Sequence, residues 1–107
     1  MQVDVIDGNS HQDQLNLVRE ALEIESNYPR AHAYLALILF TAIGRGTSRQ
    51  PKEDAAIASE QAETALGTGA SDPVVLKMCA GGLAAVGQST SALKLAEQAF
   101  DITGAPD

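Results

Sequence analysis

Apolar residues along this chain recur at intervals of three and four, and clusters of glycine, proline and serine divide them into five segments. This spacing places apolar side chains on one face of an α-helix. It predicts helices over about residues 11–25, 29–43, 51–66, 73–86 and 89–103. Residues 1–9 show only a brief alternation of valine and isoleucine among acids. We expect an extended or disordered leader there, followed by one helical domain over residues 10–107.

Three of the five segments begin with a proline. Pro29, Pro51 and Pro73 suit the first turn of a helix, where the missing N–H has no intrahelical partner to lose. Asp72 directly precedes Pro73 and is a typical capping carboxylate. The second segment is apolar nearly all round, which predicts a helix buried between neighbours. Short connections favour antiparallel neighbours. The predicted fold class is therefore all-α, a right-handed stack of antiparallel helical hairpins with about five helices.

Two stretches of the chain repeat the same spacing. Ala21 precedes Pro29 by eight positions, and Ala65 precedes Pro73 by eight positions. Ala65 and Ala99 are 34 positions apart, whereas Ala21 and Ala65 are 44 apart. We expect the ten additional residues in an enlarged, glycine-containing turn at residues 44–50. A repeat of this length indicates stacked helical units.

These residues resemble tetratricopeptide repeats, whose 34-residue unit is a pair of antiparallel helices. The alanine pattern of the second helix of that unit is found twice here, over residues 58–65 and 92–99. The bulky positions of the family are filled by other residues: His32, Leu39, Leu76 and Leu83. The resemblance covers about residues 11–105, as one unpaired second helix and two hairpins. With its enlarged first turn, the chain is also similar to the repeat region of bacterial adenylate cyclases and transcriptional regulators.

The resemblance implies a non-enzymatic module that binds a protein or an extended peptide on a concave surface. That surface is lined by the first helix of each hairpin. Carried over by position, the partner-binding residues are Arg30, Ala33, Leu37, Thr41, Val74, Lys77, Gly81 and Ala84. Lys77 matches a basic position that some relatives use to hold a peptide's terminal carboxylate, but their asparagine one turn later is Gly81 here. The alternative is a regulatory or oligomerisation segment of a larger bacterial signalling protein, such as a cyclase or transcriptional regulator.

Two and a half repeats leave both ends of the stack without a neighbour. About three repeats are usually needed for a continuous core. We therefore expect either a fragment of a longer protein or a homo-oligomer. The apolar ends available for self-association are Leu15, Val18 and Leu22 on one side and Leu95, Phe100 and Ile102 on the other.

The formal charge of −7 argues against nucleic acid and against anionic membranes as partners, because both require a basic surface. A helix-turn-helix ending in residues 89–102 would carry Lys94 as its only base. No apolar run approaches the ~20 residues of a membrane span. The first residues lack the basic and apolar regions of a signal peptide. These observations predict a cytoplasmic protein.

Candidate chemistry is sparse. His11 and His32 have no cysteine or carboxylate at ligand spacing, so we expect neither a metal nor a cofactor. Cys79 is the only cysteine and is expected to be a buried small residue. No catalytic residue is predicted, and a small enzyme, which would need a polar cluster in a pocket, is the least favoured hypothesis. Two interpretations of Gly81-Gly82 stay open: close approach of two helices, or a shallow place for a ligand backbone.

Overall fold

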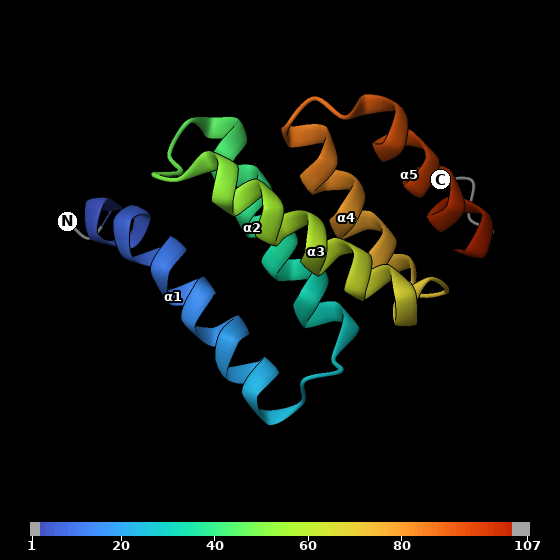
Figure 1. Cartoon of the computed structure of the whole chain (residues 1–107), viewed down its shortest axis with the longest axis horizontal. Helices are drawn as coiled ribbons and strands as arrows, with labels where there is room; N and C mark the ends of the chain where they lie inside the picture. The colour runs from blue at the N-terminus through green and yellow to red at the C-terminus, as the bar shows by residue number, and fades with distance from the viewer. Residues whose placement is uncertain (1–2, 104–107) are drawn as a thin grey trace.

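The computed structural model describes the backbone of residues 3–103 and the side chains of residues 12–103, and this part of the chain contains five helices and no strand. The helices are α1 (Val3–Ile24), α2 (Pro29–Arg45), α3 (Pro51–Gly69), α4 (Pro73–Ala85) and α5 (Ser89–Thr103) (Figure 1). The predicted all-α fold class is confirmed. The right-handed superhelical stacking of hairpins stays a prediction.

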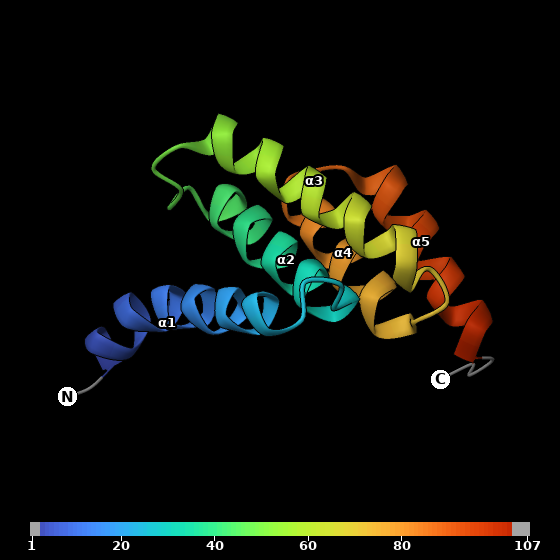
Figure 2. The ribbon, with the colours of Figure 1, turned by 60° about the horizontal axis from the view of Figure 1, so that its bottom comes forward.

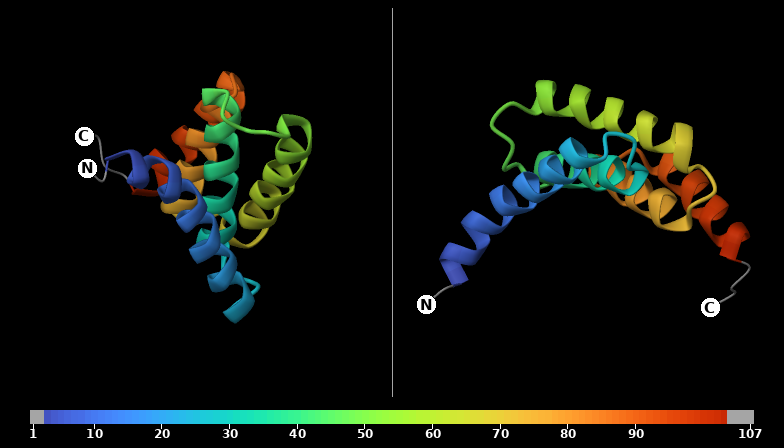
Figure 3. Two further views of the ribbon diagram at one scale, coloured as in Figure 1. Left: turned by 90° about the vertical axis from the view of Figure 1, so that its left-hand side faces the viewer. Right: turned by 90° about the horizontal axis from the view of Figure 1, so that it is seen from below.

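Each helix runs antiparallel to the next, so that α2 and α4 run parallel to each other (Figures 1 and 2). The central helix is α2, which packs against α1, α3 and α4, whereas α5 packs against α4. Figure 3 shows α1 and α3 on opposite sides of α2. In the same figure the molecule is an arch, with α1 and α5 at its two ends.

The composition of α2 explains its central place. Eight of its seventeen residues are buried, and they surround the helix instead of following one stripe. On α3 the buried residues are small, namely Ala58, Ala62, Ala65 and Gly69. Alanines at this spacing let the α3 backbone approach the larger side chains of α2 closely. Small residues therefore lie at the contact between the two helices of this hairpin.

Helix α1 is longer than predicted. It begins at Val3, within the segment expected to be an extended or disordered leader, and residues 1–2 lie outside the described part. The segment contains Gly8 but no proline. A single glycine costs a helix only about 1 kcal/mol, and each further residue adds a backbone hydrogen bond.

The ten additional residues of the first hairpin are mostly helical. Helix α2 has 17 residues against 13 in α4, and α3 has 19 against 15 in α5. The enlarged turn predicted at residues 44–50 is therefore wrong in extent, because Gly44 and Arg45 still belong to α2. The last residue of α2 is Arg45, and Gly46, which follows it, adopts a left-handed φ of 76°. The Thr47 N–H then donates to the Ala42 carbonyl at 2.9 Å, which closes the helix end.

Some apolar residues of the two end helices are exposed. Ile24 is 88% exposed and Phe100 is 51% exposed, because α1 and α5 each have a neighbour on one side only. Conversely, Leu15 and Val18, which were predicted to form an exposed end face, are buried in the main core. The apolar surface of the two end helices thus differs from the predicted one.

Candidate functional site

An open groove lies where α1, α2 and α4 meet, with a volume of about 360 Å³. Helix α2 forms its floor, since α2 packs against both other helices while α1 and α4 do not pack against each other. Its walls are mainly apolar. The lining residues are Leu17, Val18, Ala21, Tyr28, Arg30, Ala31, Tyr34, Val74 and Met78. We call this surface the α1–α2–α4 groove.

Helical spacing explains which side chains reach the groove. Leu17 and Ala21 are four residues apart on α1, and Val74 and Met78 are four apart on α4, so each pair lies on one helix face. Tyr28 and Tyr34 add aromatic rings that carry hydroxyl groups. Such a lining of apolar surface with a few polar groups suits the binding of another molecule. The tyrosines have the amphipathic character that is common in protein interfaces.

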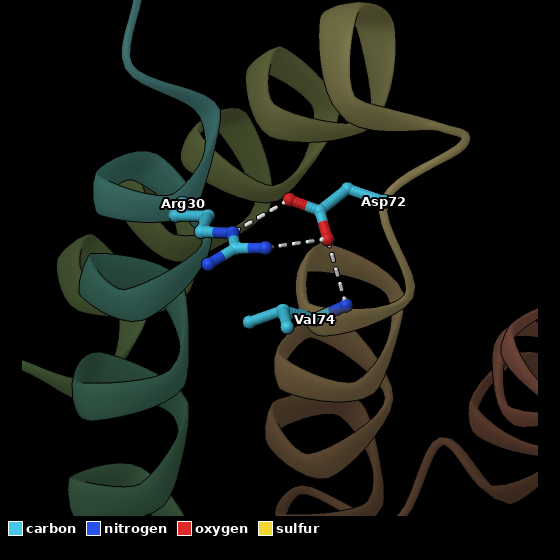
Figure 4. A network of polar contacts seen from close by, with 3 residues as sticks. All are labelled: Arg30, Asp72 and Val74. Atoms are coloured by element: carbon cyan, nitrogen blue, oxygen red, sulfur yellow. Dashed lines mark hydrogen bonds and ion pairs between the residues drawn. The ribbon is translucent and has the colours of Figure 1, made fainter. Parts of the chain in front are cut away.

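An ion pair bridges the N-terminal ends of α2 and α4 at the edge of the groove (Figure 4). The Arg30 Nε donates to Asp72 Oδ2 at 2.7 Å, and its Nη2 donates to Asp72 Oδ1 at 3.3 Å. Asp72 also caps α4, because its Oδ1 accepts the Val74 N–H at 3.0 Å. One carboxylate therefore both begins α4 and joins it to α2.

The two charges alter each other's titration. Hydrogen bonding to Arg30 is the largest effect and lowers the pKa of Asp72. Burial opposes it, and the Val74 N–H lowers the pKa further. The same hydrogen bond raises the pKa of Arg30. Half of the Arg30 side chain is exposed, so water screens the pair strongly. We therefore regard it as an orienting contact and not as a main source of stability.

The structure places the eight predicted binding residues differently with respect to the groove. Arg30 and Val74 line the groove. Lys77, Gly81 and Ala84 are exposed on α4, beside the groove, while Leu37 and Thr41 are half-buried on α2. Ala33 has no exposed surface, so it cannot contact a partner, and its predicted role is wrong. Position 33 faces inward because α4 packs against that side of α2.

The sequence-based assignment omitted seven of the nine groove residues. It took the floor from the first helix of each hairpin and did not include α1, which supplies Leu17, Val18 and Ala21. The sequence did indicate that Leu17 is unusual, since this leucine lies beside the apolar stripe of its helix and interrupts the polar face. Tyr28 and Tyr34 could also have been noticed, because they are the only two tyrosines in the chain.

The structure separates the roles of the two adjacent glycines of α4. A Cβ on Gly82 would lie 2.9 Å from Cδ2 of the buried Phe40, so Gly82 permits the close approach of α2 and α4. A Cβ on Gly81 would meet only Leu37 Cδ1, at 3.4 Å, and Gly81 is exposed. The packing interpretation therefore holds for Gly82, while Gly81 leaves backbone accessible beside the groove.

The histidine and cysteine singled out in the sequence lie outside the groove. His32 Nδ1 is 2.5 Å from Gln61 Oε1 and Nε2 is 2.7 Å from the Ser26 carbonyl oxygen, which connects α2 to α3 and to the turn after α1. Cys79 is buried, and burial raises the pKa of its thiol to about 11. The His11 side chain lies outside the described residues.

Within the described part of the chain, no group of three or more histidine, cysteine or acidic residues is placed to hold a metal. The described helices also include none with the length and apolar content needed to cross a bilayer. No protein-family model matches the chain, and neither a curated protein nor a solved structure is significantly similar to it.

Proposed function

We propose that this chain is a non-enzymatic protein-interaction module whose α1–α2–α4 groove binds an apolar segment of a protein partner. The observation that carries the proposal is the groove itself, which is open, mainly apolar and bordered by two tyrosines. Its charged lining residue, Arg30, is held by Asp72 and so is suited to orient a bound chain. The resemblance to tetratricopeptide repeats supports the same function, with a peptide as the expected ligand.

The groove suits binding better than catalysis. Its polar groups are one guanidinium and two phenol hydroxyls, and no buried polar or charged side chain occurs among the described residues. General acid–base chemistry needs titratable groups held within hydrogen-bond reach of a substrate. An apolar surface with a few polar groups at its edge instead provides contact area and orientation.

The proposal can be tested with peptides selected against the full chain from a random phage-displayed library. Affinities of the selected peptides are then measured by fluorescence anisotropy for the wild type and two variants. Leu17→Asp places a charge in the groove at a side chain that is 65% exposed, so folding is little affected. Ile57→Asp is the matched control, because Ile57 is 41% exposed and lies on α3, outside the groove.

We expect Leu17→Asp to weaken peptide binding at least about tenfold, since a charge buried in an apolar contact is costly. Ile57→Asp is expected to bind as the wild type does. Equal weakening by both variants, or selected peptides that bind Leu17→Asp normally, would contradict the assignment of the groove. An absence of any selected peptide with measurable affinity would contradict the proposed function itself.

A further inference from the structure

The described part of the chain has a second prominent apolar surface, on α5. Leu93, Ala96 and Phe100 follow one another at spacings of three and four, so they form one stripe along the helix. Leu93 is 61% exposed and Phe100 is 51% exposed. We call Leu93, Ala96 and Phe100 the α5 stripe. Helix α5 packs against α4 on another side, so the stripe faces away from the core.

We propose that the α1–α2–α4 groove of one copy receives the α5 stripe of a second copy, an inference that rests on the proposed function because it names the partner of that groove. A helix with apolar residues at i, i+3 and i+7 is a common ligand of an apolar groove between helices. The stripe offers this spacing, with the small Ala96 between two large side chains. The α1–α2–α4 groove offers apolar walls on either side of α2.

The charges beside the two surfaces are complementary. Glu97 and Asp101 line a shallow hollow of α5 together with Ala96 and Phe100. Lys94 is the single base on the same edge, so two acids against one base leave that edge acidic. Beside the groove, Lys77 is exposed on α4 and makes no ion pair within the described residues. We therefore place the acidic edge of α5 along α4. The α1 side is less suitable, because Glu20 is exposed one turn from the groove residue Leu17.

In a simpler alternative, two α5 stripes pair with each other about a two-fold axis. Antiparallel pairing centred near Ala96 would place Glu97 close to both Glu97 and Lys94 of the second copy, so charge does not decide against it. Such a dimer would leave both grooves open, whereas a groove-to-stripe contact buries two apolar surfaces at once. The sedimentation of mixed variants distinguishes the two arrangements.

A groove-to-stripe contact is heterologous, since the two copies use different surfaces. Each dimer still has one free groove and one free stripe, so further copies can add. This property gives a test that an isologous dimer would fail. A copy with a defective groove and a copy with a defective stripe retain exactly one working contact between them. Their mixture therefore forms a dimer that cannot grow.

The test uses sedimentation velocity and equilibrium on the full chain from about 10 µM to about 1 mM, which brackets the affinity of an interface below standard size. Leu17→Asp places a charge in the groove and should prevent it from binding the stripe. Leu93→Asp places a charge in the stripe and should prevent it from binding the groove. Ile57→Asp on α3 is the control for charge at an exposed apolar residue, because Ile57 is 41% exposed and lies in neither surface. Circular dichroism confirms that each variant is folded.

We expect the mass of the wild type and of Ile57→Asp to rise with concentration, while Leu17→Asp and Leu93→Asp each stay monomeric. An equimolar mixture of the last two forms a 1:1 dimer and nothing larger. Lys77→Glu changes only an exposed charge and weakens association about threefold. At high salt the weakening is smaller, because the charges are screened. This variant keeps the test valid if the aspartate in either apolar surface disturbs folding.

Three results would overturn the inference: a mixture that stays monomeric, a Leu17→Asp variant that still associates, or a wild type that is monomeric throughout the range. The peptide selection distinguishes the two proposals. A monomeric wild type that binds selected peptides through Leu17 overturns the self-association alone. A monomeric wild type that binds no peptide overturns the proposed function as well.

Discussion

Replacing Gly44 by alanine tests how closely α2 and α4 pack. Gly44 lies in the last turn of α2, where alanine is intrinsically the better helix former by about 1 kcal/mol. However, a Cβ at this position would lie 2.3 Å from the carbonyl oxygen of Ala85 on α4. The obstructing atom belongs to the backbone, so no side-chain rotation relieves the contact. The two helices must move apart instead.

The size of the effect follows from these two opposing terms. Ordinary contact begins at 3.4 Å, so the Cβ needs a further 1.1 Å (3.4 minus 2.3). Overpacking of this kind typically costs about 1–3 kcal/mol. After subtraction of the helix-propensity gain of about 1 kcal/mol, we expect Gly44→Ala to lower the free energy of unfolding by about 0–2 kcal/mol. For a domain of this size, each kcal/mol of that loss lowers Tm by roughly 4–8 °C.

Gly67→Ala is the matched control, because Gly67 is also in a last turn, that of α3, and its Cβ would have no atom within 4 Å. This variant should gain about 0.5–1 kcal/mol. Urea and thermal unfolding, followed by circular dichroism, measure both. The difference between the two variants isolates the strain at the α2–α4 contact. If Gly44→Ala is stabilised as much as Gly67→Ala, the described approach of the two helices is wrong.

Three further predictions concern the core and the ion pair. Ala58→Leu should destabilise the fold by about 2–3 kcal/mol in urea unfolding, because Ala58 is fully buried, whereas Leu at the exposed Ala56 should change stability by less than about 0.5 kcal/mol. Arg30 holds the pKa of Asp72 in the folded chain below the ordinary value of 3.8. The ionised carboxylate therefore stabilises the fold fully above about pH 3.8. This contribution is lost as the pH falls through the lower pKa of the folded state. Acid unfolding should therefore show a larger loss of stability from pH 4 downward in the wild type than in Asp72→Asn, which keeps a capping oxygen; equal pH profiles would contradict this. Burial raises the pKa of the Cys79 thiol to about 11, so at neutral pH it should react with a disulfide reagent only when the chain unfolds. The labelling rate should therefore increase with urea concentration. Rapid labelling of the native chain would show that Cys79 is accessible in the folded state.

The local structure was largely predictable because its signals are local. Proline at positions 29, 51 and 73 begins α2, α3 and α4 where predicted, since proline fits only the first turn of a regular helix. The capping role predicted for Asp72 is confirmed by its hydrogen bond from Val74. The end of α2 was less predictable, because Gly44 and Gly46 are equally good breakers in sequence. Only Gly46 adopts a left-handed φ, while Gly44 stays helical against α4.

The groove was predictable only in part. A pattern of residues identifies the faces of a helix, but it does not say which neighbour covers each face. Ala33 and Tyr34 are adjacent in sequence, and the packing of α4 against α2 buries the first and leaves the second in the groove. The participation of Leu17 follows from the placement of α1 on the side of α2 opposite α3 (Figure 3).

The amino-acid sequence by itself thus determined the all-α fold class, the starts of α2 to α5 and the small residues at the hairpin contact, because backbone sterics and helical periodicity act within a few residues. The tertiary structure decided which apolar side chains stay exposed. Phe100 and Ile24 are as apolar as their buried neighbours, yet they remain at the surface because each end helix packs on one side only. Burial is a property of the neighbours that a side chain meets, and those neighbours come from distant parts of the chain.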